Sequence, residues 1–164
     1  KKLSHFSRVH IDVSFNDRLP ERPATQTMPS LLGHEEPVTW KIYPIEYIIA
    51  EKVQTFFDRG SANSRAKDIY DLLHLFPRCK NQKALTAAIN QTFKNRETPL
   101  PESWEGQSGQ FDKTVLRAAW PGVKVWGEKP DFDDAWSLLT ERLRELDQNS
   151  SFSMASPKRS TTIE

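Results

Sequence analysis

The stretch IEYIIAEKVQTFFDRGSANSRAKDIYD, from Ile45 to Asp71, decides the fold of this chain. Apolar residues recur in it every three or four positions, which predicts two amphipathic helices, over 45–58 and over 65–76. Between them, Gly60 is a suitable C-terminal residue for the first helix, and Ser64 is a suitable N-cap for the second. A connection this short predicts that the helices run antiparallel and pack on their apolar faces.

Lys52 lies inside the apolar stripe of the first predicted helix, between Ile49 and Phe56. Burial of an unpaired ammonium group costs several kcal/mol, so this lysine needs a partner or a path to solvent. One interpretation is a side chain that reaches water or forms a structural ion pair, as long charged side chains often do. The other is a lysine that binds an anionic ligand such as a phosphate.

The second predicted helix carries possible partners for this lysine. Asp68 lies at the edge of its apolar face, Asp71 follows on the same flank, and Arg65 lies near the apolar centre and is drawn towards the interior. Helix packing would bring Lys52, Arg65 and Asp68 within pairing range. The pattern alone leaves two possibilities open: Asp68 only neutralises a cation and joins the two helices, or these charges form a ligand site.

The residues before this pair predict a small amount of sheet. Apolar and polar residues alternate between Phe6 and Phe15, which predicts a strand, and a second short strand is predicted over 38–43. The proline-containing segment 18–37 between them predicts an irregular connection. We therefore expect an α+β fold in which two strands precede a helical bundle.

The residues after the pair predict further helices. The spacing favours a helix over 83–94, a loop over 97–110, a short helix over 111–120 and a final amphipathic helix that opens at Asp131. The Ser/Thr-rich end, 148–164, is typical of a disordered tail. The expected division of the chain is therefore into sheet strands at 1–43, a helical domain at 44–147 and a tail at 148–164.

Composition excludes several classes of protein. The net charge of +1 gives no general attraction for polyanions, and the single cysteine, Cys79, excludes a disulfide framework. No apolar run is long enough to cross a bilayer, so we expect no membrane association and a cytoplasmic location. The four histidines form no metal-binding pattern, and the tryptophans are better explained by packing than by base stacking.

Three motifs carry a resemblance to a known family. They are the AEK motif at 49–53, the Arg59-Gly60 turn and the run Ser64-Arg65-Ala66-Lys67-Asp68-Ile69-Tyr70-Asp71-Leu72. Together they resemble the C-terminal motif region of the AbiEii/AbiGii nucleotidyltransferase toxins, which belong to the polymerase-β-like superfamily. The strand 11–17 and the Tyr43-Pro44 step also fit this family. The resemblance implies that the two predicted strands are a remnant of a nucleotidyltransferase sheet. The similarity is clear over 8–76 and diffuse over 77–147.

The resemblance implies an activity and partners. It implies transfer of a nucleoside monophosphate from an NTP to an RNA, with transfer RNA as the expected acceptor and Mg²⁺ as the cofactor. It also implies a bacterial toxin–antitoxin or phage-defence system with a separately encoded antitoxin. The roles implied for single residues are catalysis for Lys52, Asp68 and Asp71, nucleotide binding for Lys52, Arg65 and Lys67, and metal binding for Asp12.

The sequence also departs from the family pattern. The first family motif, a Gly-Gly/Ser turn followed by an Asp-x-Asp strand that carries the principal metal ligands, does not occur in it. We therefore expect a fragment or truncated product with an incomplete metal site. The alternatives are a non-catalytic helical module that binds RNA or a partner, an inactive gene remnant, and an unrelated helical domain in which the Lys52–Asp68 pair is structural.

Overall fold

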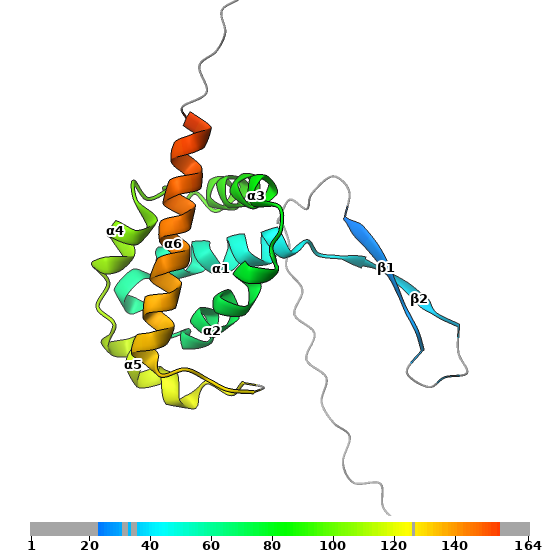
Figure 1. Ribbon diagram of the computed structural model, residues 1–164, viewed down its shortest axis with the longest axis horizontal. Coiled ribbons are helices and arrows are strands. Elements are labelled where there is room, and N and C mark those ends of the chain that lie inside the picture. The colour runs from blue at the N-terminus through cyan, green and yellow to red at the C-terminus, as the bar shows by residue number, and fades with distance from the viewer. Residues whose placement is uncertain (1–22, 31–32, 34–35, 126, 155–164) are drawn as a thin grey trace, which may run out of the picture.

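The structure, a computed structural model, describes residues 23–30, 33, 36–125 and 127–154. It confirms the α+β class, because a two-stranded antiparallel ribbon precedes a body of helices (Figure 1). The strands are β1 (Ala24–Met28) and β2 (Val38–Ile42). The α-helices are α1 (Ile45–Arg59), α2 (Ala66–Leu75), α3 (Gln82–Asn95), α4 (Trp104–Gly109), α5 (Thr114–Ala119) and α6 (Phe132–Met154), and the 3₁₀ turns are η1 (Gly60–Ala62), η2 (Phe76–Arg78) and η3 (Trp120–Gly122).

The ribbon projects away from the helical body (Figure 1). β1 pairs antiparallel with β2 so that Gln26 lies opposite Trp40, and every residue of β1 is exposed. The predicted second strand is thus confirmed, but the prediction that 18–37 is irregular is wrong at β1. The ATQTM sequence of this strand contains no proline, and its backbone donors can therefore join the ladder. The strand predicted over Phe6–Phe15 lies outside the described residues.

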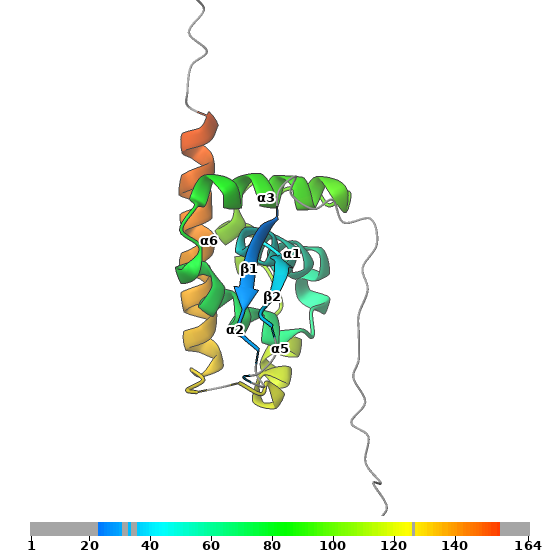
Figure 2. The same ribbon diagram turned by 90° about the vertical axis from the view of Figure 1, so that its right-hand side faces the viewer.

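Helix α1 is central to the core, as its apolar stripe predicted. Ile49, Val53 and Phe56 are almost fully buried, and α1 packs mainly against α3 and α2. Helix α6 packs against α2 and α4 and runs along one side of the body (Figure 2). The inward residues predicted for the third and the last helix are buried as well: Leu85, Ala88, Ile89 and Phe93 in α3, and Phe132, Trp136, Leu139, Leu143 and Leu146 in α6.

The prediction of a loop over 97–110 is wrong, because this segment contains α4. The Ser103 hydroxyl accepts a hydrogen bond from Gly106 N at 2.9 Å, and the carboxylate of Asp147 accepts from the backbone of Trp104 and Glu105 at 2.8 and 3.1 Å. Asp147 belongs to α6, so the group that stabilises this helix start is distant in sequence. Burial of Trp104 adds to the stability of α4.

Other predicted boundaries shift at helix ends. Helix α5 begins only at Thr114, where Asp112 accepts a hydrogen bond from the Thr114 backbone at 2.9 Å. Helix α6 begins after Asp131, whose carboxylate accepts from Asp134 N at 2.9 Å, as predicted. It continues to Met154, so the predicted tail is helical over its first residues, whereas 155–164 lie outside the described residues.

The four tryptophans that the structure describes divide into two groups, and Trp126 lies outside the described residues. Trp104, Trp120 and Trp136 are buried in the core, as predicted, but Trp40 is 57% exposed on β2 because nothing described packs over the ribbon. None of the helices in the described part of the chain is long and apolar enough to cross a membrane.

Candidate functional site

The α1–α2 pair brings Lys52 between two carboxylates. Its Nζ donates hydrogen bonds to Asp68 Oδ1 at 2.7 Å and to Asp71 Oδ2 at 2.8 Å. The Lys52 side chain is 21% exposed, and that of Asp68 is only 3% exposed. The pairing that the helical spacing predicted for Lys52 and Asp68 is therefore present, and Asp71 completes it.

Two further cations extend this cluster towards solvent. Arg65 Nε lies 2.8 Å from Asp68 Oδ2 as an ion pair without the alignment of a hydrogen bond, and Lys67 Nζ donates to Asp71 Oδ1 at 2.6 Å. We call these five residues, Lys52, Arg65, Lys67, Asp68 and Asp71, the α1–α2 charge cluster. Three cations and two carboxylates leave it with one positive charge in excess.

The expectation that Arg65 turns inward is wrong, because its side chain is 52% exposed. Helix α2 begins at Ala66, and Arg65 precedes it with a non-helical backbone at φ −85° and ψ 60°. A helical wheel therefore does not place its side chain. Ser64 is not the N-cap either; instead Asn63 Oδ1 accepts a hydrogen bond from Arg65 N at 2.8 Å.

The two carboxylates keep Lys52 charged. Burial by itself would lower the pKa of Lys52, but the hydrogen bonds to Asp68 and Asp71 outweigh it and the pKa lies above its ordinary value. Burial would likewise raise the pKa of Asp71, but the hydrogen bonds from Lys52 and Lys67 lower it overall. At neutral pH the cluster therefore holds a charged ammonium group.

Two cavities meet at this ammonium group. The smaller, of about 300 Å³, lies against α3 and is lined by Tyr43, Glu51, Lys52, Thr55, Arg65, Arg96 and neighbours. The larger, of about 700 Å³, lies towards η3 and is lined by the whole charge cluster together with Lys124, Gly122 and neighbours. Lys52, Arg65 and Asp68 line both cavities, so a ligand in either one can reach Lys52.

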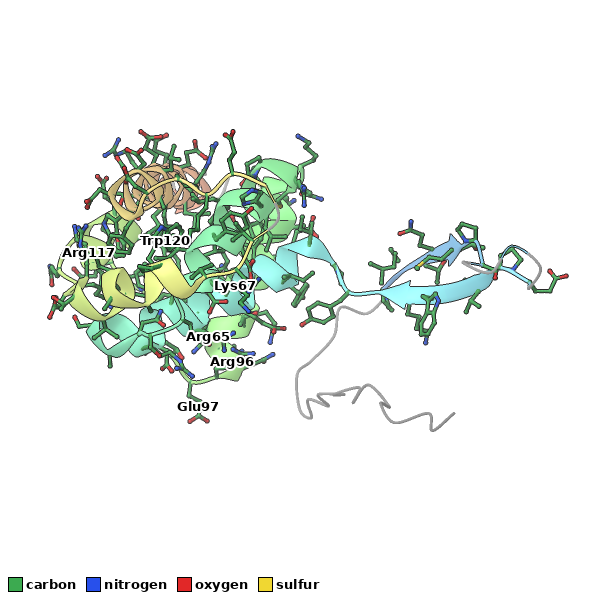
Figure 3. All side chains as sticks on the ribbon, turned by 90° about the horizontal axis from the view of Figure 1, so that it is seen from below. Arg65, Lys67, Arg96, Glu97, Arg117 and Trp120 are labelled. Carbon is green, nitrogen blue, oxygen red and sulfur yellow. The ribbon has the colours of Figure 1, made fainter. Side chains whose placement is uncertain are left out.

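Sequence reasoning found Lys52, Arg65 and Asp68 in the smaller cavity but missed Tyr43, Glu51 and Arg96. The Glu51 carboxylate accepts a hydrogen bond from the Tyr43 hydroxyl and lies 3.5 Å from Arg96 Nη2. Arg96 Nη1 also donates to Gln54 Oε1 at 2.8 Å, which ties the end of α3 to α1. Figure 3 shows Arg65, Lys67 and Arg96 on the same side of the helical body. The motifs quoted above contain Glu51 and Tyr43, but no spacing connects Arg96 to them.

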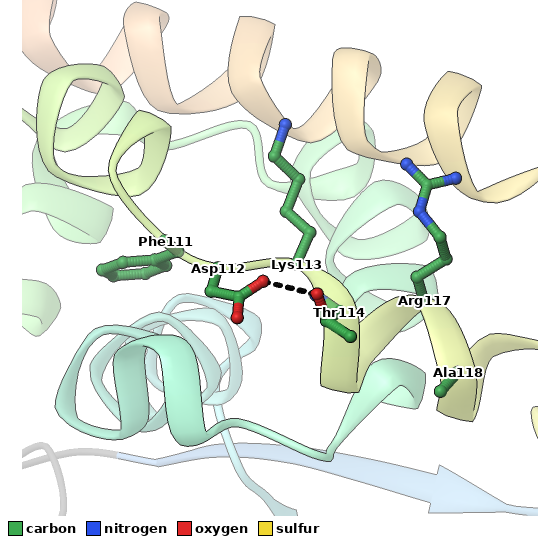
Figure 4. A pocket seen from close by; sticks show the side chains of 6 residues that line it. All are labelled: Phe111, Asp112, Lys113, Thr114, Arg117 and Ala118. Atoms are coloured by element: carbon green, nitrogen blue, oxygen red, sulfur yellow. Dashed lines mark hydrogen bonds between the residues drawn. The ribbon is translucent and has the colours of Figure 1, made fainter.

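A third hollow, of about 570 Å³, lies at Phe111–Ala118 (Figure 4). Its two cations are already engaged, because Arg117 pairs with Asp133 at 2.5 Å and Lys113 lies 5.0 Å from the centre of the Trp136 ring. Asp112 accepts hydrogen bonds from Thr114. These contacts explain every charge in the hollow structurally, and we assign it no ligand.

The described residues do not by themselves fit a metal ion. Within residues 23–30, 33, 36–125 and 127–154 there is no group of three or more His, Cys, Asp or Glu side chains that could hold one. Asp68 and Asp71 are both already paired with cations. Asp12, the expected metal ligand, lies outside the described residues, so its role stays a prediction.

Comparison with known proteins gives the family. A sequence profile described as "Nucleotidyl transferase AbiEii toxin, Type IV TA system" matches residues 4–150. The chain belongs to this family. The AbiEii match covers the ribbon, the charge cluster and α3 to α5, and so extends well beyond the motifs that carry the resemblance. Comparison with the curated proteins and with the solved structures finds no match.

Membership of the AbiEii family gives the general class of activity. The family is one of nucleotidyltransferase toxins from type IV toxin–antitoxin systems, in which a toxin is accompanied by an antitoxin. A protein of this class must bind the phosphates of a nucleotide, and the charge cluster is a cationic group held beside two cavities.

Proposed function

We propose that this AbiEii chain takes part in the transfer of a nucleoside monophosphate from an NTP to an RNA acceptor, with transfer RNA as the leading candidate. The observation that carries the proposal is Lys52, whose ammonium group is fixed by Asp68 and Asp71 where two cavities meet. An ammonium group has three donor hydrogens, and these two carboxylates use two. The third is available for a phosphate oxygen.

In the proposed reaction, a hydroxyl oxygen of the RNA attacks the α-phosphorus of the NTP. The new phosphorus–oxygen bond forms as the bond from the α-phosphorus to the bridging oxygen breaks, and pyrophosphate leaves while the hydroxyl proton passes to solvent. Such a reaction depends more on positioning and on neutralisation of charge than on covalent catalysis. Lys52 and Arg65 would supply positive charge at the phosphates, with Lys67 beside them.

The carboxylates have a positioning role in this proposal. Asp68 is almost fully buried and holds Lys52 and Arg65 together, and Asp71 joins Lys52 to Lys67. The two carboxylates neutralise two of the three cations, so the cluster does not need a ligand to offset repulsion between them. The remaining positive charge would attract an anion. Arg96 lines the smaller cavity together with Lys52 and would be a second phosphate contact.

The proposed reaction would also use a Mg²⁺ ion, and the residues that hold it would lie outside the charge cluster. Bound to the phosphates of the NTP, it would stabilise the charge of the leaving pyrophosphate. The described residues do not fit such an ion, and Asp12 is the residue proposed to contribute to its site. The toxic activity would be opposed by the separately encoded antitoxin, in a toxin–antitoxin or phage-defence setting.

The test is transfer of radiolabelled nucleotide from each NTP to unfractionated transfer RNA, using the complete gene product and its Lys52→Met variant. We expect Lys52→Met to reduce labelling by about a hundredfold, the typical effect of removing one charge-stabilising donor. Lys83→Met is the matched control, since Lys83 is exposed on the first turn of α3 and lines neither cavity. Equal labelling by the wild type and Lys52→Met would contradict the assignment.

A second candidate function is a non-catalytic module with a structural ion pair. This candidate is favoured because the charges of the cluster already pair with one another, each carboxylate with two cations. Exchange of the charges, with Lys52→Asp and Asp68→Lys together, separates the candidates. The exchange also places a carboxylate beside Asp71 and an ammonium group beside Arg65, so both candidates predict some loss of stability. A non-catalytic module predicts no change in any activity of the folded protein, whereas a phosphate-binding Lys52 predicts loss of transfer.

A further inference from the structure

The two cavities at Lys52 differ in the charges that line them. In the larger one, four cations, Lys52, Arg65, Lys67 and Lys124, stand against the two carboxylates of the cluster, so the excess is two positive charges. The net charge of the whole chain is only +1. The larger cavity is therefore a local concentration of positive charge and not part of a general basic surface.

We propose that the larger cavity binds the phosphodiester backbone of the RNA acceptor, with Lys124 as the principal contact and Lys67 beside it, and that the smaller cavity takes the triphosphate. This proposal rests on the proposed function and divides its two substrates between two places. Lys52 and Arg65 line both cavities, so they are where the α-phosphate and the acceptor hydroxyl would meet.

The larger cavity has room for a longer ligand than the smaller one. Its volume of about 700 Å³ compares with about 300 Å³ for the smaller one. Its wall opposite α2 is built from the small, uncharged residues Ala119, Gly122 and Val123. A Cβ added at Gly122 would meet no atom within 4 Å, so the wall is open there. A sugar–phosphate backbone can lie against such a wall.

Hydrogen bonds from Lys129 and Trp120 stabilise the backbone of this wall. Lys129 Nζ donates hydrogen bonds to three backbone carbonyls at η3. They are those of Trp120 at 2.9 Å, Pro121 at 3.3 Å and Val123 at 3.1 Å. The indole of Trp120 also donates to the carbonyl of Pro130 at 3.1 Å. These bonds fix the turn from which Lys124 projects, so Lys129 is a positioning residue for this wall. A fixed wall lowers the entropy cost of binding.

Lys124 is better suited to bind a ligand than the other cations of the cavity. Lys67 is already bonded to Asp71, and Arg65 to Asp68. Lys124 is exposed, and in the part of the chain that the structure describes it forms no ion pair. Phosphate contacts made by such lysines position a nucleic acid without reading its sequence and weaken as salt rises.

The experiment is equilibrium binding of fluorescently labelled, unfractionated transfer RNA at several salt concentrations, with binding of a labelled NTP measured in parallel. We expect Lys124→Glu to weaken RNA binding about tenfold and to reduce the slope of log affinity against log salt by about 0.7 to 1. Lys124→Arg should bind like the wild type. NTP binding should be unchanged in both variants.

Lys83→Glu is the matched control, because it makes the same charge change on an exposed lysine away from the cavities. Equal RNA affinity for Lys124→Glu and Lys83→Glu would overturn this inference, and Lys52-dependent transfer would then still support the proposed function. Equal weakening of RNA and NTP binding by Lys124→Glu would overturn the division between the cavities. Selective RNA binding through Lys124 without any transfer would uphold this site while the proposed function fails.

Discussion

The α1–α2 charge cluster and the junction of α4 with α6 are built from the same kinds of side chain. At the junction, Arg144 forms two hydrogen bonds with Glu105, and Asp147 binds the start of α4. Neither Arg144 nor Asp147 lines any of the three cavities described above, whereas the cluster lines two of them. Ion pairs alone therefore do not single out a candidate site, and the cluster differs from the junction by its excess charge beside two cavities.

The largest effect on stability is expected from Asp68→Ala. This change removes the buried carboxylate that holds Lys52 and Arg65 together, and breaking such a buried pair costs about 3 kcal/mol even though Asp71 still pairs with Lys52. Urea unfolding followed by circular dichroism measures the loss. Glu105→Ala at the junction is the control, and its effect should be much smaller because that pair is exposed to solvent. Equal losses would remove the distinction between the two regions.

Asp147→Ala should have an intermediate effect that separates stability from activity. The change removes the acceptor for the first backbone donors of α4, and loss of a helix cap costs about 1–2 kcal/mol. Thermal unfolding should show the loss, while nucleotide transfer measured well below the unfolding temperature should stay at the wild-type level. A fall in transfer as large as that of Lys52→Met would mean that the junction belongs to the site.

The smallest effect is expected from pH. Because the pKa of Asp71 is lowered in the folded state, its contribution to stability is present above 3.8 and is lost as pH falls through the lower folded value. Because the pKa of Lys52 is raised, its contribution is present below 10.5 and is lost as pH rises through the higher folded value. The unfolding free energy of the wild type, minus that of Asp71→Asn, should therefore shrink in acid, where Asp71 is protonated, and again in strong base, where Lys52 loses its proton.

That difference should stay flat between pH 5 and 9, roughly the range between the two titrations. The comparison is made by urea unfolding at matched ionic strength, since screening also weakens ion pairs. A difference that changes steadily through neutral pH would show that another group, not Asp71, governs the response.

Helical periodicity predicted most of the fold and part of the site. It located Lys52 and Asp68 on facing surfaces because each lies in or beside a well-defined apolar stripe. It placed Arg65 wrongly, since that residue precedes the helix, and it could not find Arg96, which meets Glu51 only through the packing of α3 on α1. Helix α4 was missed for a similar reason, because its capping carboxylate comes from Asp147 in a distant helix.

The exposed ribbon has a consequence for the timescales of the molecule. No residue of β1 or β2 is buried, and isolated two-stranded ribbons are only marginally stable. Ribbon amides are therefore expected to exchange with deuterated solvent through local opening, while amides near Ile49 and Phe56 exchange only when the helical body unfolds. The chain would then show two ranges of amide exchange rate. A partner that covers Trp40 and its neighbours should slow the faster exchange, that of the ribbon.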